Sequence, residues 1–176
     1  KNKKIIGVGE SGLDFYYNHS EASIQKKVFL KHIEACQATS KPLIVHSRNA
    51  ERDTLEILSS EKKNKNFDVL MHCFTGSKEF AHNLIDIDCY FSASGVITFK
   101  KSTELAKTFK SIPNDKILVE TDSPYLSPEP LRGKINVPSN IVHTVKFISI
   151  LKETTEKDVE KFTTNNFQQL FNLNIV

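Results

Sequence analysis

The chain has 176 residues, of which 39% are hydrophobic and 26% are charged, with only six Gly and six Pro. This composition is typical of a soluble globular protein and excludes a disordered chain, a collagen and a disulfide-rich scaffold. The formal net charge of +3 is too balanced for a polybasic arm, so charge by itself names no partner.

Five short apolar runs alternate with longer helical patterns, and this order predicts βα units around a parallel sheet. Most runs are continuous, as in strands buried on both faces, and they cover residues 5–9, 43–46, 69–72, 90–94 and 117–121. Helical spacing follows each of the first four runs, within residues 20–36, 50–58, 77–85 and 103–109. In the first helix we expect Ser20 to be the cap, and the apolar face to carry Ile24, Val28, Ile33 and Cys36.

The last apolar run is followed by a proline-rich loop over residues 123–138 and by two more helices. The first of these has apolar residues at helical spacing between Ile141 and Leu151. The second begins after Thr155, which lies three residues before Asp158 in a capping-box arrangement. No linker, repeat or composition break interrupts the chain, so residues 1–176 are expected to form one domain.

Targeting signals are not evident in the sequence. Three cysteines, an odd number at irregular spacing, favour a reducing compartment. No stretch approaches the roughly 18 uninterrupted apolar residues of a membrane span, and the basic start leads into too few apolar residues for a signal peptide. We therefore expect a cytoplasmic protein without a membrane partner, unless a targeting segment precedes Lys1.

A glycine motif at residues 7–12 has the spacing G-x-G-x-x-G of dinucleotide-binding turns. Such a turn should open directly into a helix, whereas this one runs into the segment from Leu13 to Asn18 before any helical pattern begins. The acidic residue expected about 20 positions later falls near Glu34, within a helix. The motif therefore does not predict a dinucleotide site.

Residues that commonly bind metals stand at the ends of four strand-like runs. In parallel α/β barrels the carboxyl ends of the strands line the active site, and there the sequence places Glu10, His46, His72 and Asp122. Any single one could be a core residue with a backbone partner. Four at equivalent positions favour a site for Zn, Mn or Mg, with carboxylates able to bridge two ions.

Arg48 follows His46 by two residues and could present bidentate donors to a phosphate. An ion pair between Arg48 and Glu51 is an equally acceptable interpretation. The other histidines, including His19 in the first βα loop, are better explained by surface or packing roles.

Four segments together resemble the TatD family of metal-dependent deoxyribonucleases: residues 9–14 (GESGLD), 45–48 (VHSR), 72–76 (HCFTG) and 120–126 (ETDSPYL). The resemblance extends to residues 132–138 and 165–171 and so covers nearly the entire chain. It implies a TIM (β/α)8 barrel of the metal-dependent hydrolase superfamily that hydrolyses DNA with two divalent ions. Glu10 would be shared by both ions, His46 and His72 would bind one, and Asp122 would bind the other and accept a proton.

The sequence departs from the family pattern in one respect, because no His-x-His occurs in it. The family opens with a strand bearing Asp-x-His-x-His, and a full barrel has eight βα units in about 250 residues. We therefore expect strands 4 to 8 of such a barrel, the C-terminal part of a longer product. A natural truncation with one ion and little catalysis is the alternative.

The resulting functional hypothesis is a metal-dependent DNase of the 3′–5′ exonuclease type that uses two ions of Mg, Mn or Zn and is monomeric at full length, with Arg48 binding the substrate. One alternative is hydrolysis of a carbonyl substrate, such as an ester on aminoacylated RNA, because an activated water attacks carbon as well as phosphorus. A second is a truncated, non-catalytic nucleic-acid-binding protein.

Overall fold

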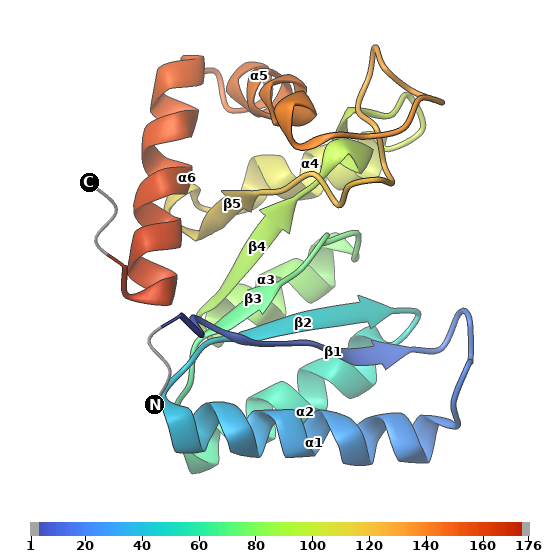
Figure 1. The fold of residues 1–176 in the computed structure, drawn as a ribbon, viewed down its shortest axis with the longest axis vertical. Helices are drawn as coiled ribbons and strands as arrows, with labels where there is room; N and C mark the ends of the chain where they lie inside the picture. Colours follow the sequence, from blue (N-terminus) through green and yellow to red (C-terminus); the bar gives the residue numbers. More distant parts are fainter. Residues whose placement is uncertain (1–3, 174–176) are drawn as a thin grey trace.

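The computed structural model describes residues 4–173, and in them five parallel strands form one sheet (Figure 1). The strands pair in chain order, and they are β1 (Val8–Asp14), β2 (Leu43–Arg48), β3 (Val69–Met71), β4 (Cys89–Ala93) and β5 (Ile117–Val119). All four pairings are parallel, so the predicted α/β class is confirmed. The carboxyl ends of all five strands therefore lie at one edge of the sheet.

Helices follow the strands as the apolar spacing predicts. A helix comes after each of the first four strands, and these are α1 (Ala22–Thr39), α2 (Glu51–Asn64), α3 (Lys78–Asp86) and α4 (Thr103–Ser111). Three short 3-10 helices, η1 (Gly95–Thr98), η2 (Asn114–Lys116) and η3 (Pro138–Asn140), lie in the connections. The chain then forms α5 (Ile141–Leu151) and α6 (Glu156–Phe171), and the capping box of Thr155 and Asp158 begins α6 as expected.

Alternate residues of the strands pack on the two faces of the sheet. Val45, Met71 and Phe91 belong to the large buried core that also contains the inner faces of α1 to α4. The residues between them, such as Leu70 and Tyr90, belong to a second cluster with the end of α6. The strands are therefore buried on both faces, as their continuous apolar runs predict.

The first βα unit differs from its expectation in three ways. Strand β1 begins at Val8 and continues to Asp14, so residues 5–7 lie outside it. Ser20 does not cap α1, whose N-cap is Glu21 without a side-chain hydrogen bond. Ile24 and Val28 are 50% and 46% exposed, and the buried residues of α1 are Phe29, Ile33 and Cys36.

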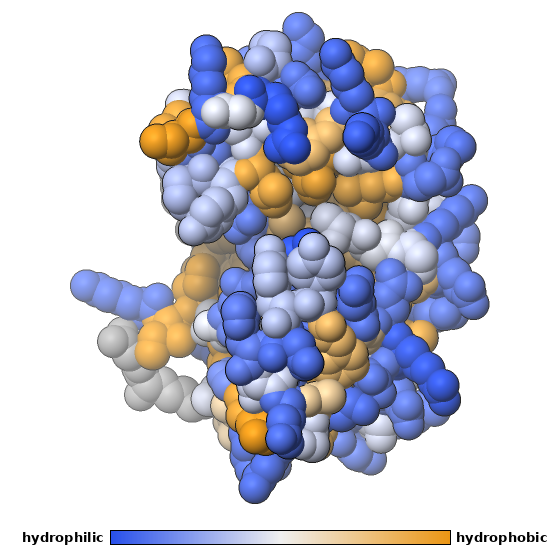
Figure 2. Space-filling view, turned by 90° about the vertical axis from the view of Figure 1, so that its right-hand side faces the viewer, coloured by the Kyte–Doolittle hydropathy of each residue, from blue (hydrophilic) through white to orange (hydrophobic). Residues whose placement is uncertain are grey.

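The exposure of Ile24 and Val28 is consistent with the position of β1 at the edge of the sheet. In the described part of the chain β1 has one neighbour, β2, so only the part of α1 that packs over this pair is covered. Figure 2 looks onto the side toward which β1 and β2 point in Figure 1, and hydrophilic residues with apolar patches between them form this surface. None of the helices within residues 4–173 has the length and apolar character needed to cross a bilayer.

Candidate metal centre

Five residues singled out from the sequence line one cavity of about 800 Å³ at the carboxyl edge of the sheet. Strand β1 supplies Glu10 from within the strand, four residues before its end and not at its end as expected, because β1 continues to Asp14. Strand β2 supplies His46 and Arg48. His72 comes directly after β3, and Asp122 lies three residues beyond β5. The fold thus brings together side chains that are up to 112 residues apart in the sequence.

Glu10 lies between the two imidazoles. Its Oε1 atom is 3.2 Å from His46 Nδ1 and 3.8 Å from His72 Nε2. The same nitrogen, His72 Nε2, is also 3.7 Å from Asp122 Oδ1. Distances of 3.7 and 3.8 Å exceed a direct hydrogen bond. They suit two donor atoms that share an ion with bonds of about 2.0–2.2 Å.

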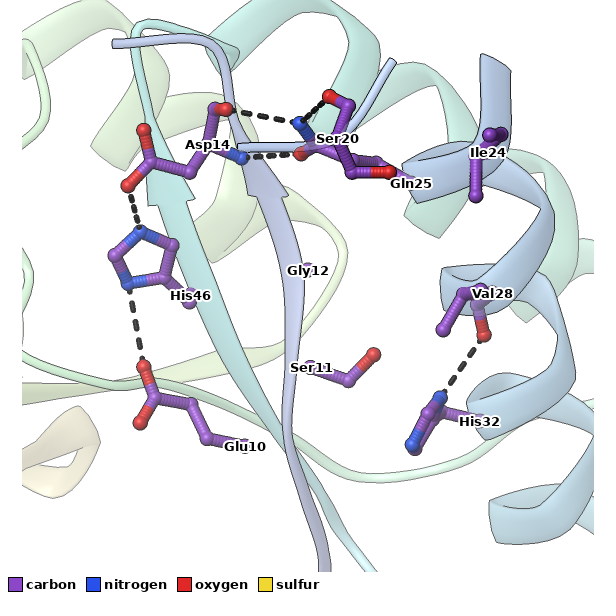
Figure 3. Close-up of a pocket in the computed structure, with 10 residues that line it drawn as sticks. All are labelled: Glu10, Ser11, Gly12, Asp14, Ser20, Ile24, Gln25, Val28, His32 and His46. Atoms are coloured by element: carbon purple, nitrogen blue, oxygen red, sulfur yellow. Dashed lines mark hydrogen bonds and ion pairs between the residues drawn. The ribbon is translucent and has the colours of Figure 1, made fainter. Parts of the chain in front are cut away.

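Each histidine also contacts a second carboxylate through its other ring nitrogen. His46 Nε2 is 2.9 Å from Asp14 Oδ2, and Figure 3 shows Asp14, His46 and Glu10 in one line. His72 Nδ1 is 3.0 Å from Glu120 Oε2. A carboxylate that accepts one ring N–H leaves the other nitrogen as a lone pair, as is usual for metal-binding histidines. In both rings that free nitrogen faces Glu10.

Asp14 and Glu120 belong to the quoted motifs, but the sequence analysis assigned them no role. Asp14 lies four residues after Glu10, and Glu120 two residues before Asp122, so the motif spacing alone could have marked them as candidates. Their partners could not be inferred in this way, because His46 and His72 are 32 and 48 residues away from them in the chain.

Negative charge accumulates around His72. Burial lowers the pKa of this imidazole, but the hydrogen bond and charge of Glu120, with the charges of Glu10 and Asp122, outweigh it and raise the pKa above its ordinary value. The pKa of Asp122 is also raised, first by burial and then by the charges of Glu120 and Glu10, against the opposing effect of His72. A positive charge at this point is therefore favoured.

The donor set fits a divalent cation. Within residues 4–173, His72, Glu120 and Asp122 form the one group whose donor atoms all lie within 4.8 Å of one another. The second oxygen of Glu120, Oε1, is buried without a hydrogen-bond partner in the structure. Because Glu120 Oε2 already contacts Nδ1 of His72, we assign Glu120 the role of orienting this ring. Glu10 and Asp122 are then the carboxylates that face the other ring nitrogen, His72 Nε2.

The loop after β5 holds Asp122 by means of a buried asparagine. Asn136 is 2% exposed, and its amide donates to the carbonyl oxygens of Thr121 and Tyr125, both at 2.8 Å. Asp122 itself has a left-handed backbone with φ of 55°, which residues other than glycine adopt mainly where surrounding contacts enforce it.

Arg48 lies against two aromatic rings at the cavity. Its guanidinium carbon is 4.0 Å from the ring centre of Tyr16 and 4.7 Å from that of Tyr17. Glu51, the alternative partner, accepts hydrogen bonds from the backbone N–H and the hydroxyl of Ser77. Arg48 therefore lies in an aromatic environment beside the candidate metal-binding residues.

The glycine motif has a packing explanation. A Cβ atom at Gly12 would lie 1.8 Å from the carbonyl oxygen of His46, and one at Gly9 would lie 2.6 Å from that of Ile44. Both glycines therefore allow β1 to approach β2 closely, inside a strand rather than in a turn before a helix.

Comparison with protein families decides the relationship. The family model for the TatD related DNases matches residues 1–172. The chain belongs to the TatD family. Its TatD relatives include two proteins named as uncharacterized metal-dependent hydrolases. One, from Buchnera aphidicola subsp. Acyrthosiphon pisum, is 47% identical over 97% of this chain and 64% of its own length. The other, from Bacillus subtilis, is 39% identical over 98% of this chain and 68% of its own length.

Solved TatD structures share the fold. A TatD homologue from Escherichia coli aligns with a TM-score of 0.90 at 22% identity, over 98% of this chain and 66% of its own. A TatD family hydrolase from Entamoeba histolytica aligns with a TM-score of 0.84 at 21% identity, over 96% and 64%. The predicted TIM-barrel fold of metal-dependent hydrolases is thereby confirmed. The chain spans about two thirds of the length of these TatD relatives.

Proposed function

We propose that the chain is part of a metal-dependent hydrolase that cleaves phosphodiester bonds in DNA, of the 3′–5′ exonuclease or general DNase type. The observation that carries this proposal is the position of Glu10 between two imidazoles, each oriented by its own carboxylate. Membership of the TatD related DNases and the names of the relatives as metal-dependent hydrolases support it.

The residues divide into ligands and supports. Glu10 would be shared between two divalent ions, of Mg, Mn or Zn, while His46 and His72 would bind one of them and Asp122 the other. Such ions would polarise a water molecule and stabilise the charge that develops on the phosphate during hydrolysis. Asp14 and Glu120 would hold the two rings in the required orientation.

Two further tasks fall to residues of the cavity. Asp122 faces the cavity beside His72 and is the candidate acceptor for the proton of the attacking water. Arg48 would bind a phosphate of the substrate with its planar pair of N–H donors. Because phosphate contacts release counterions, substrate binding should weaken as the salt concentration rises.

The proposal is tested with 5′-end-labelled single-stranded DNA in Mg or Mn, with EDTA as the control. Both the 176-residue chain and the complete reading frame that contains it should be assayed, with an aminoacylated RNA as a parallel ester substrate. We expect metal-dependent shortening of the DNA from its 3′ end and none in EDTA. Metal-dependent cleavage of the ester alone would support the carbonyl hydrolase instead, and DNA binding without cleavage would support a non-catalytic protein.

A further inference from the structure

The loop between β1 and α1 forms an aromatic clamp around Arg48. We define the clamp as Tyr16, Tyr17 and Arg48. The two tyrosine rings meet edge to face with their centres 5.0 Å apart, and the guanidinium carbon of Arg48 lies within 4.7 Å of both ring centres. The imidazole of His19 stacks on Tyr17 at 5.6 Å and extends this arrangement.

The carboxylate of Asp14 connects the clamp with the candidate metal-binding residues. Asp14 Oδ1 accepts hydrogen bonds from the backbone N–H groups of Tyr16 at 3.0 Å and Tyr17 at 2.8 Å. Asp14 Oδ2 contacts the ring of His46 at 2.9 Å. The side chain of Gln25 fixes the backbone of Asp14 from α1, because its amide bonds both the N–H and the carbonyl oxygen of that residue (Figure 3).

The charge of Asp14 is favoured by the same contacts. Burial opposes its ionisation, but hydrogen bonds from Tyr17, His46 and Tyr16 together lower its pKa below the ordinary value. The two oxygens of Asp14 thus contact the tyrosine loop and the ring of His46 at the same time.

The clamp is exposed at the rim of the cavity. Tyr16 and Tyr17 are 57% and 55% exposed, so they contribute little to the buried core. Tyr17 and Arg48 line the same cavity as Glu10 and Asp122, and among the described residues of this lining Arg48 is the one Lys or Arg. A polyanion that approaches the carboxylates of the site would meet this cation first.

We propose that Tyr16 and Tyr17 are positioning residues that hold the guanidinium of Arg48 as a preformed clamp for a backbone phosphate, and that Asp14 sets this clamp in register with His46. The inference rests on the proposed function, since it names how the same site would take its phosphodiester substrate. A stacked guanidinium keeps its N–H edge free for bidentate binding, and less rotamer freedom is lost when the phosphate arrives.

The test removes the π faces but keeps an apolar side chain at both positions. We compare two double variants in the complete reading frame, after circular dichroism has verified folding. One carries both Tyr16→Leu and Tyr17→Leu. The matched control carries both Tyr16→Phe and Tyr17→Phe. Each cation–π contact at an exposed site favours the held position of the guanidinium by roughly a two- to fivefold factor. We expect about tenfold weaker binding of a fluorescein-labelled single-stranded decanucleotide in EDTA for the leucine pair, and less than about twofold for the phenylalanine pair.

A variant without Arg48 tests whether the tyrosines act by positioning Arg48 or by contacting the DNA directly. In Arg48→Ala the leucine pair should cause no further loss of binding, and with metal present the leucine pair should raise KM while kcat changes less than about threefold. Three results would each overturn the clamp. The leucine and phenylalanine pairs could bind the decanucleotide equally well, the leucine pair could weaken binding further in the Arg48→Ala background, or the wild-type protein could fail to bind. Because binding is measured without turnover, a protein that binds DNA through the clamp but never cleaves it would refute the proposed function alone.

Discussion

The two histidines of the candidate centre have the same pattern of partners but are supported by different parts of the molecule. His72 comes directly after the central strand β3 and Glu120 directly after β5, and their side chains are 20% and 18% exposed. His46 and Asp14 lie on the edge pair β1 and β2, with side chains 34% and 23% exposed. Asp14 also holds the exposed tyrosine loop, whereas Glu120 has no such second task in the described contacts.

This comparison shows how one chemical arrangement can serve two purposes. The His72 half is the less exposed of the two, so burial restricts the orientation of its ring and of Glu120. The His46 half shares its carboxylate with the clamp around Arg48 and thereby connects ion binding with substrate binding. Among the ion pairs of residues 4–173, those of Glu10 reach both halves.

The largest effect is expected from Glu10→Gln, which removes the charge common to both halves. Turnover on DNA should fall at least about a thousandfold, because neither half retains a carboxylate between the imidazoles. The measurement is kcat in Mn, together with calorimetric titration of the metal. The control is Glu34→Gln, which alters an exposed carboxylate paired with Lys31 far from the site. Turnover within tenfold of the wild type would refute the shared role of Glu10.

The difference between the halves is tested by Glu120→Gln against Asp14→Asn. Loss of an orienting carboxylate typically lowers metal affinity by about 10–100-fold, and we expect Glu120→Gln to lie at the upper end because its half is more enclosed. Asp14→Asn should lower metal affinity less but should weaken oligonucleotide binding in EDTA, which Glu120→Gln should leave unchanged. If both variants changed metal affinity and oligonucleotide binding to the same extent, the two halves would not differ in function.

A smaller effect on activity and a clear effect on stability are expected for Asn136→Ala. The variant removes the buried amide that donates to the carbonyl oxygens of Thr121 and Tyr125, which should lower the free energy of unfolding by about 1–3 kcal/mol. Metal affinity should fall as well, because Asp122 belongs to the loop that Asn136 holds. Urea denaturation measures the first quantity and calorimetry the second. Asn140→Ala, which removes a single contact to Asn136, should cost less than half as much.

The smallest effect is expected at Thr155, remote from both halves. Thr155→Ala removes the cap of α6 and should lower the free energy of unfolding by about 1 kcal/mol, while Thr155→Ser should retain most of it. In a domain of this size the expected fall in Tm is about 2–4 °C, which thermal circular dichroism can resolve. Metal affinity and oligonucleotide binding should not change, and a change in either would show that α6 is coupled to the site.

The elements could be predicted well at four of the five strands. The apolar runs at β2, β3, β4 and β5 predict strands close to those observed, because strands buried on both faces are apolar throughout. The prediction failed in the first βα unit, where β1 starts later than expected and Ile24 and Val28 of α1 are exposed. Apolar spacing reports which residues could be buried, and the packing of the folded chain decides which of them are.

The sequence by itself determined that His46, His72 and Asp122 would meet, because the carboxyl ends of parallel strands share one edge of the sheet; Glu10 joins them from inside β1, which the sequence did not predict. Tertiary structure alone decided which ring nitrogen faces Glu10, which carboxylates orient the rings, and that two tyrosines enclose Arg48. These features depend on contacts of about 3–5 Å between distant segments, and side-chain positions at that scale are set by the packed fold and not by order along the chain.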